Sequence, residues 1–170
     1  MVKEYTSAEL QDWLFQKATE ARSANIARKI ILGNDQRGRD TTVIGRLYFF
    51  KYDPKWKHKL VKYDKFPMVF PLERYSDGFL GINLHYLSAG DRQVLIDGML
   101  QYKNNTLMDE STRLLLSYKR LMAIANIRSM AQMCVKRYLF RHVKSQFIEI
   151  LADEYDKAIQ LPVEDWVFKQ

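Results

Sequence analysis

Three aromatic and β-branched stretches decide the fold: VIGRLYFFKY at residues 43–52, PMVFPLERY at 67–75 and FLGINLHYL at 79–87. Their apolar residues recur at short spacing, which is typical of strands. The turn-forming pairs Asp53-Pro54 and Asp77-Gly78 stand between them. We therefore expect a small antiparallel, β-barrel-like (SH3-like) sheet. Its strands are expected near residues 44–52, 67–73 and 79–86.

The segment KWKHKLVKYDK at residues 55–65 joins the first two of these stretches. It predicts either a fourth, shorter strand near residues 60–63 or a long basic hairpin loop. In the next stretch, Pro67 and Pro71 have no backbone N–H to donate. Their strand is therefore expected at a sheet edge or at a bulge.

Helical spacing of apolar residues appears on both sides of the strands. An N-terminal helix is predicted over residues 7–32, and NDQRGRDTT at 34–42 is predicted to be a loop. After the strands, Ser88 is a candidate N-cap. Further helices are predicted from residue 88 to near the turn at 104–105, from 109 through 125, and over 131–141. A strand at 146–150 and a short helix from its cap Asp153 to about residue 160 follow. In the second of these helices the residues expected to face inward are Leu114, Leu115, Tyr118, Leu121, Met122 and Ala125.

No Pro/Ser-rich linker and no internal repeat divides the chain. The expected fold class is α+β, with helices inserted between the strands of the sheet and an N-terminal helix. The expected organisation is an N-terminal helical extension at residues 1–33, a loop at 34–43 and a single α+β domain at 44–170.

Composition excludes several classes of protein. The chain has 170 residues, 47% of them hydrophobic, which is enough to bury a core and argues against disorder. Its one cysteine excludes an internal disulfide, and no Cys/His spacing suits zinc. No signal peptide and no apolar run long enough for a membrane span is visible. We expect a soluble protein of a reducing compartment, without a membrane partner.

The positive charge is segregated along the chain. The net charge is +7, but residues 113–144 carry +8 with no Asp or Glu, residues 51–65 carry +4, and the chain from residue 149 carries −4. The basic candidates in the first segment are Arg113, Lys119, Arg120, Arg128, Lys136, Arg137, Arg141 and Lys144. Those in the second are Lys55, Lys57, Lys59 and Lys62. On the predicted helix, Arg137, Arg141 and Lys144 would share one face.

This distribution has three interpretations. Basic residues that neutralise phosphates release counterions, and exposed aromatic residues among the lysines could stack on unpaired bases, so nucleic acid is one candidate partner. A second is the acidic surface of another protein. The third is structural: a solvated lysine-rich loop whose aromatic side chains belong to the core.

Catalytic chemistry has little support in the sequence. The three histidines are dispersed, and His85 is expected to be a buried or half-buried structural residue in a strand. Cys134 is expected to be a buried helical thiol. Gly78 and Gly81 lack the rest of a phosphate-loop motif and suit tight turns or close packing. We therefore predict a non-enzyme with no catalytic residue, metal site or cofactor.

Seven short motifs lie along the chain: YDPK at 52–55, YDKFP at 63–67, DGFLGINLHYL at 77–87, LSYK at 116–119, KRYLF at 136–140, ADE at 152–154 and LPVE at 161–164. Together they resemble a family of small virion proteins of T-even-like tailed bacteriophages, often labelled DNA end protectors. The resemblance covers residues 44–166.

The resemblance implies a virion structural protein that binds the ends of packaged DNA and shields them from host exonuclease, and it supplies no catalytic residue. The implied partners are other virion subunits, in a symmetric assembly, and double-stranded DNA. The implied location is the virion, and the host cytoplasm during assembly. Two alternatives remain open: an assembly protein of the phage neck, tail or baseplate that contacts acidic subunits, and a small inhibitor or regulator of a host enzyme.

Overall fold

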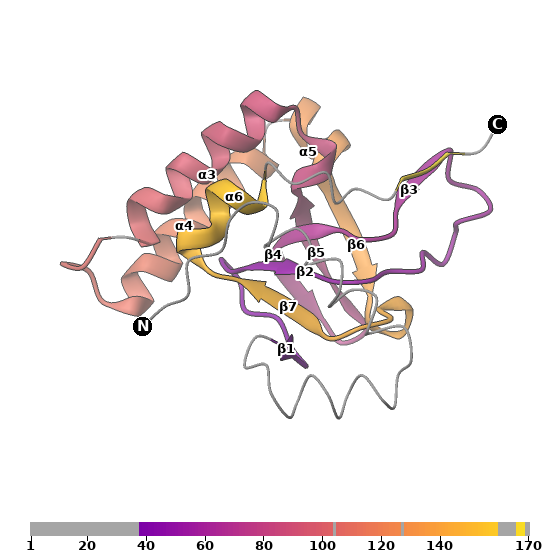
Figure 1. Cartoon of the computed structure of the whole chain (residues 1–170), viewed down its shortest axis with the longest axis horizontal. Helices are drawn as coiled ribbons and strands as arrows, with labels where there is room; N and C mark the ends of the chain where they lie inside the picture. The colour runs from indigo at the N-terminus through magenta and orange to yellow at the C-terminus, as the bar shows by residue number, and fades with distance from the viewer. Residues whose placement is uncertain (1–37, 104, 127, 160–165, 169–170) are drawn as a thin grey trace.

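The structure is a computed structural model that describes residues 38–103, 105–126, 128–159 and 166–168. It confirms the α+β class. Helices α3, α4 and α6 gather on one side of a sheet, and the segment that carries β3 projects away from it (Figure 1). The predicted N-terminal helix at residues 7–32 lies outside the described residues, and the proposed division into extension, loop and domain stays a prediction.

The main sheet has six antiparallel strands in the order β1-β7-β2-β4-β5-β6. Their bounds are β1 Gly38–Arg39, β2 Leu47–Phe49, β4 Met68–Tyr75, β5 Gly78–Asn83, β6 Val135–Leu139 and β7 Phe147–Ile150. A second sheet pairs β3 (Lys62–Asp64) with β8 (Trp166–Phe168). Strands were therefore predicted correctly in all three opening stretches and near residues 146–150, and of the two alternatives left open for residues 55–65 the structure shows the short strand, β3.

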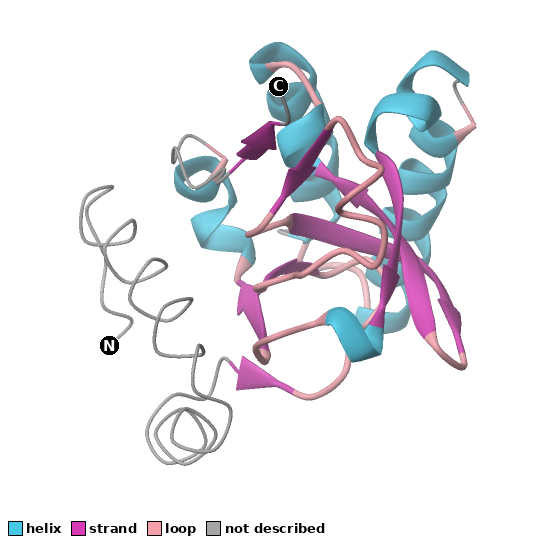
Figure 2. Ribbon diagram, turned by 90° about the vertical axis from the view of Figure 1, so that its right-hand side faces the viewer, coloured by secondary structure: helices cyan, strands magenta, loops and turns pink. Residues whose placement is uncertain are grey.

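The sheet is open, so the prediction of a closed, barrel-like sheet is wrong. Within the described part of the chain, the edge strands β1 and β6 pair with no strand beyond β7 and β5. Beyond the β2–β7 pairing, the chain after β2 stays beside the chain before β7 through an isolated bridge of Tyr52 with Val143, and the Leu139 N–H donates to the Tyr52 hydroxyl. The strong twist of the strands is visible in Figure 2. An aromatic cluster fills the curved face instead of a closing ladder.

Successive side chains of a strand point to opposite faces of the sheet. Each face of this sheet carries a cluster of buried apolar residues. In β2, Leu47 and Phe49 face the helices, while Tyr48 faces the opposite side. The helix-side core adds residues from β4, β5, α3, α4 and α6. The opposite side holds a second cluster of Tyr48, Phe50, Tyr52, Val69, Phe79, Tyr138 and Phe147. Ring contacts in it include Phe50 with Tyr138, at 5.4 Å between centroids.

Three helices are inserted between β5 and β6, as expected: α3 (Ala89–Lys103), α4 (Glu110–Ala125) and α5 (Arg128–Cys134). The Ser88 hydroxyl accepts the Asp91 N–H at 3.1 Å, which confirms the predicted cap. Asp109 caps α4 by accepting the Thr112 N–H. The chain also forms three short 3-10 helices: η1 (Leu84–Tyr86), η2 (Phe140–His142) and η3 (Ala152–Glu154). Helix α6 (Tyr155–Ala158) follows η3 directly.

The predicted helix over residues 131–141 is correct as far as Cys134 and wrong beyond it. Helix α5 ends at Cys134, and the next five residues form β6, which pairs with β5 from Ile82↔Val135 to Gly78↔Leu139. The free edge of β5 provides hydrogen-bond partners that outweigh the local helical pattern. Consequently Arg137, Arg141 and Lys144 do not share a helical face.

Smaller differences have local causes. Leu115, expected to face inward, is 52% exposed because it lies on the outer side of α4. Asp153 lies inside η3, whose N-cap is Leu151, and therefore does not cap a helix. His85 is buried as expected, but in η1 rather than in a strand. The predicted loop at residues 34–42 includes β1, which pairs with β7.

Two expectations about special residues are confirmed. Pro71 lies in β4 where the register with β5 shifts between Pro71 and Glu73, so it marks a bulge. Gly78 lies where a Cβ atom would stand 2.0 Å from the Tyr138 carbonyl oxygen, and at Gly81 a Cβ would stand 2.4 Å from a Val69 methyl. Both glycines permit close approach of neighbouring strands.

Candidate nucleic-acid interface

A cavity of about 340 Å³ lies between the basic segment at residues 52–65, here called the basic hairpin, and strand β6. It brings together parts of the two basic stretches that the sequence keeps far apart. Its walls are formed by Tyr52, Pro54, Lys55, Trp56, Leu60, Tyr63, Asp64, Tyr86, Lys136, Arg137, Tyr138 and Leu139. Five of these residues are aromatic and three are basic.

Backbone hydrogen bonds hold the base of the basic hairpin against the end of β6. The Tyr52 N–H donates to the Lys65 carbonyl at 2.9 Å, which closes the hairpin. The Asp53 N–H donates to the His142 carbonyl, also at 2.9 Å. At the tip, the Lys59 N–H donates to the Trp56 carbonyl at 2.8 Å and forms a tight turn. The lysines of the hairpin are thus presented by an ordered backbone.

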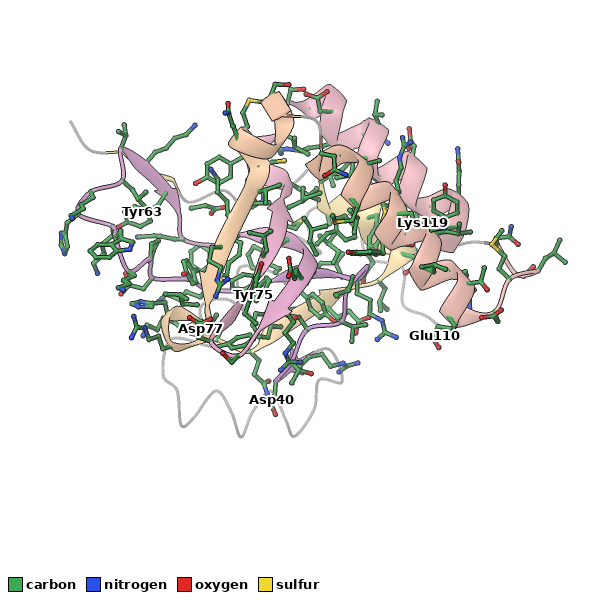
Figure 3. All side chains as sticks on the ribbon, turned by 180° about the vertical axis from the view of Figure 1, so that it is seen from behind. Asp40, Tyr63, Tyr75, Asp77, Glu110 and Lys119 are labelled. Atoms are coloured by element: carbon green, nitrogen blue, oxygen red, sulfur yellow. The ribbon has the colours of Figure 1, made fainter. Side chains whose placement is uncertain are left out.

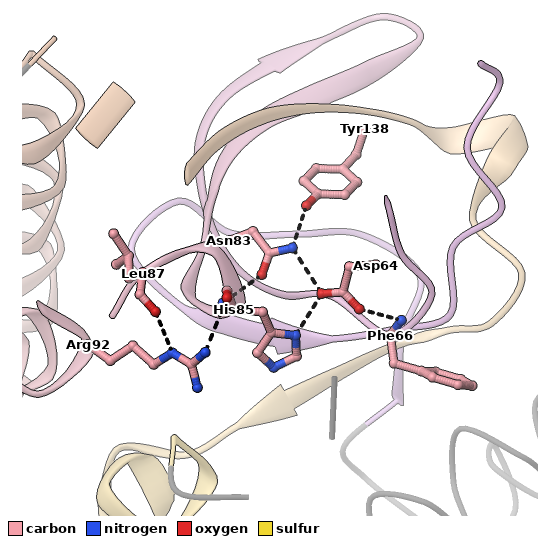
Figure 4. A network of polar contacts seen from close by, with 7 residues as sticks. All are labelled: Asp64, Phe66, Asn83, His85, Leu87, Arg92 and Tyr138. Carbon is pink, nitrogen blue, oxygen red and sulfur yellow. Dashed lines mark hydrogen bonds and ion pairs between the residues drawn. The ribbon is translucent and has the colours of Figure 1, made fainter. Parts of the chain in front are cut away.

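Two residues of the cavity wall, Asp64 and Tyr138, belong to a buried polar network (Figure 4). The Asn83 amide donates to Asp64 Oδ2 and to the Tyr138 hydroxyl, each at 3.1 Å. Asp64 also accepts the Phe66 N–H at 2.9 Å, and its Oδ2 lies 2.6 Å from His85 Nδ1. These contacts join the hairpin, β5 and β6. The network therefore fixes where the hairpin stands relative to the sheet.

Cationic side chains lie over two aromatic rings of this region, the exposed Trp56 and the half-buried Tyr86. Lys55 and Lys59 place their ammonium groups 4.7 and 4.8 Å from the centroid of the Trp56 ring, which is 54% exposed. Lys136 and Lys62 lie 4.3 and 5.6 Å from the Tyr86 ring. Attraction between a cation and a ring face orders these long side chains.

Burial alters the electrostatics of this wall. It lowers the pKa of Lys136, and the nearby charge of Lys62 lowers that pKa further. Burial together with the Asp64 carboxylate raises the pKa of Tyr86 to about 12. At neutral pH the cavity therefore presents neutral phenols beside ammonium groups.

The structure gathers five of the twelve predicted basic residues around the cavity or its rim: Lys55, Lys59, Lys62, Lys136 and Arg137. Arg137 forms an ion pair with Asp77 and lies 3.8 Å over the Tyr75 ring. In Figure 3, Tyr75 and Asp77 lie together toward one end of the strands.

The other predicted basic residues lie away from the cavity or contact other parts of the protein. Lys57 forms an ion pair with Asp53 at 2.9 Å. Lys119 is on α4, at the opposite end of the molecule from Tyr63 of the hairpin (Figure 3). The Arg120 guanidinium packs against Gly98 of α3.

The remaining residues of that set are spread over two regions. Arg113 is on α4, while Arg141 is on η2 and Lys144 follows it, both exposed. The Arg128 side chain lies outside the described part of the structure.

Sequence reasoning missed three residues of the site: Asn83, Tyr86 and Tyr138. The signal for Asn83 was present, because an amide within the apolar run FLGINLHYL must find buried partners. Tyr138 could not be found once residues 131–141 were read as a helix. Tyr86 has no signal of its own, because the sequence predicts it to be the last residue of a strand.

The residues that the structure describes contain neither a cluster of metal ligands nor a helix that could span a membrane. There, no group of three or more His, Cys, Asp or Glu residues is placed to hold a metal ion. Within the same residues, no helix has the length and apolar character that a membrane crossing requires.

An ordered cationic wall lined with aromatic rings is a surface that suits a polyanion such as nucleic acid. Comparison with known protein families also points to a protein that acts on DNA. The family model of the phage T4 terminal DNA protecting protein matches residues 13–170. The chain belongs to that phage family, whose function is the protection of DNA ends. No curated protein and no solved structure matches the chain.

Proposed function

We propose that the chain is a non-enzymatic virion protein that binds the ends of linear duplex DNA through the cavity and its rim. The observation that carries this proposal is the meeting of the basic hairpin with β6, which concentrates Lys55, Lys59, Lys62 and Lys136 on one face. A bound protein at a terminus denies an exonuclease its starting point without any bond being made or broken.

Two further features support DNA as the partner on this face. Exposed Trp56 offers a stacking surface between two lysines, and stacking on a base contributes roughly 1–3 kcal/mol. The backbone of the hairpin is held at its base and at its tip, so little order has to be gained on binding. We also propose that the protein travels in the virion with other virion subunits and is present in the host cytoplasm during assembly.

The test compares two charge reversals of equal size. Lys59→Glu lies on the proposed face, and Lys119→Glu lies on α4 at the far end. Binding of a linear duplex is measured by fluorescence anisotropy over a range of salt concentrations, and protection of the same duplex by its survival with an exonuclease.

Lys59→Glu is expected to weaken binding about tenfold at low salt, because a cation is replaced by an anion, and to reduce the salt slope by about 1, because one phosphate contact is lost. Lys119→Glu should bind and protect like the wild type. Absence of DNA affinity at low salt would overturn the proposal and favour an acidic protein as the partner. Equal losses in both variants would show that this face is not the binding surface.

A further inference from the structure

Lys136 occupies an unusual position for a lysine. It lies on β6 opposite Gly81, is half-buried, and lines the cavity with its ammonium 4.3 Å from the Tyr86 ring. Most lysines extend into water because dehydrating an ammonium is costly. A cation kept in a partly dry cavity gains most from an anion brought to it.

No side chain among the described residues supplies that anion. In those residues no carboxylate forms an ion pair with Lys136, while Asp77 pairs with Arg137. Asp64 also lines the cavity, but three donors hold its oxygens: the Phe66 N–H, the Asn83 amide and the His85 ring. The charge of Lys62, near the same Tyr86 ring, adds to the positive potential and contributes to the lowered pKa of Lys136.

We propose that this cavity receives the terminal phosphate monoester of a DNA strand, with Lys136 as its central cationic contact. The proposal rests on the proposed function and names the chemical feature of the DNA end that is recognised. A terminal phosphate carries close to two negative charges, whereas a phosphodiester within the chain carries one. A strand also continues on both sides of an internal phosphate, so a terminus enters a cavity more readily.

Neighbouring residues suit the rest of the terminal nucleotide. Trp56 and Tyr63 of the hairpin line the same cavity, so the last base would lie beside aromatic rings. Lys55, over Trp56, is near enough to this rim to meet the following phosphate of the backbone. Recognition of the terminus and attachment to the duplex would thus use adjacent residues of one surface.

The test uses blunt duplexes of one sequence that carry a 5′-phosphate, a 3′-phosphate or only hydroxyl ends, and their dissociation constants are measured by anisotropy. Wild-type protein is expected to bind one phosphorylated duplex about tenfold more tightly than the hydroxyl duplex, the gain of one charge-assisted contact. The two phosphorylated duplexes show which strand end enters.

Lys136→Met keeps the length and apolar stem of the side chain and should bind the phosphorylated and hydroxyl duplexes with equal affinity. Lys136→Arg keeps the charge and should retain it, and Lys119→Met is the control for loss of one charge elsewhere. Equal affinity of the wild type for all three duplexes, or a preference that survives in Lys136→Met, overturns this inference alone. Absence of binding to any duplex overturns the proposed function and this inference with it.

Discussion

Asn83→Ala tests the buried network that positions the basic hairpin. The Asn83 side chain makes three hydrogen bonds in the core: it accepts the His85 N–H at 3.0 Å and donates to Asp64 and to the Tyr138 hydroxyl. Asn83 is fully buried, and Tyr138 and His85 are nearly so. Truncation to Ala removes all three bonds and leaves buried groups of the neighbours without a partner.

The magnitude follows from these losses. Each buried group left unsatisfied costs about 1–3 kcal/mol, and Asp64 keeps two other donors, so the free energy of unfolding should fall by about 3 kcal/mol. With a urea slope of about 2 kcal/mol per molar, the unfolding midpoint falls by roughly 1.5 M. DNA affinity should fall as well, because the hairpin loses its link to β5 and β6.

Urea unfolding followed by circular dichroism measures the change. The control is Gln93→Ala, which removes hydrogen bonds to Asp97 and Asp156 that are exposed, and should change the stability by no more than about 0.5 kcal/mol. If Asn83→Ala unfolds at the same urea concentration as this control, the network does not stabilise the hairpin in the manner described.

Two further predictions concern stability. Gly78→Ala should lower the free energy of unfolding by about 3 kcal/mol or more, because the new Cβ would stand 2.0 Å from the Tyr138 carbonyl oxygen in the backbone of β6. Gly90→Ala on α3, with open space around it, is the matched control. Equal melting temperatures of the two variants would contradict the close packing of β5 on β6. The free energy of unfolding should also fall as the pH rises from 10 to about 12, because unfolded tyrosines ionise near 10 while folded Tyr86 keeps its proton until about 12. Urea midpoints across this interval, with Tyr86→Phe showing a shallower decline, check the effect, and a constant midpoint would count against it.

Local pattern was enough for much of the fold. Alternation and turn residues predicted β4 and β5, and the Ser88 cap marked the beginning of α3. The pattern failed at residues 135–139, where a strand exists because β5 offers a free edge. It also could not decide between strand and loop for β3, whose partner is β8. These outcomes depend on contacts between residues far apart in the chain.

The candidate site was predictable only in part, for the same reason. Counting charges found both basic stretches, and the interleaved aromatic residues pointed to Trp56 and Tyr63. That Lys136 and the hairpin would share a cavity follows from the register Gly81↔Lys136 and from the Asn83 bridge to Asp64. The same counting, by contrast, gave Lys119 and Arg120 the same weight as Lys136.

The pairing of β3 with β8 also has a consequence for the folding and motion of this protein. Lys62 pairs with Phe168, about 100 residues further along the chain, and closing so long a loop is slow and entropically costly. Such a pair forms late in folding and is among the first to separate. The β3–β8 pair should therefore separate while the six-stranded sheet and the Asn83 link to Asp64 stay intact, and amide hydrogen exchange would be faster in β3 than in β4. The segment proposed to meet DNA is thus fixed to the sheet at its base, and β3 is the part of it that loses its strand partner first.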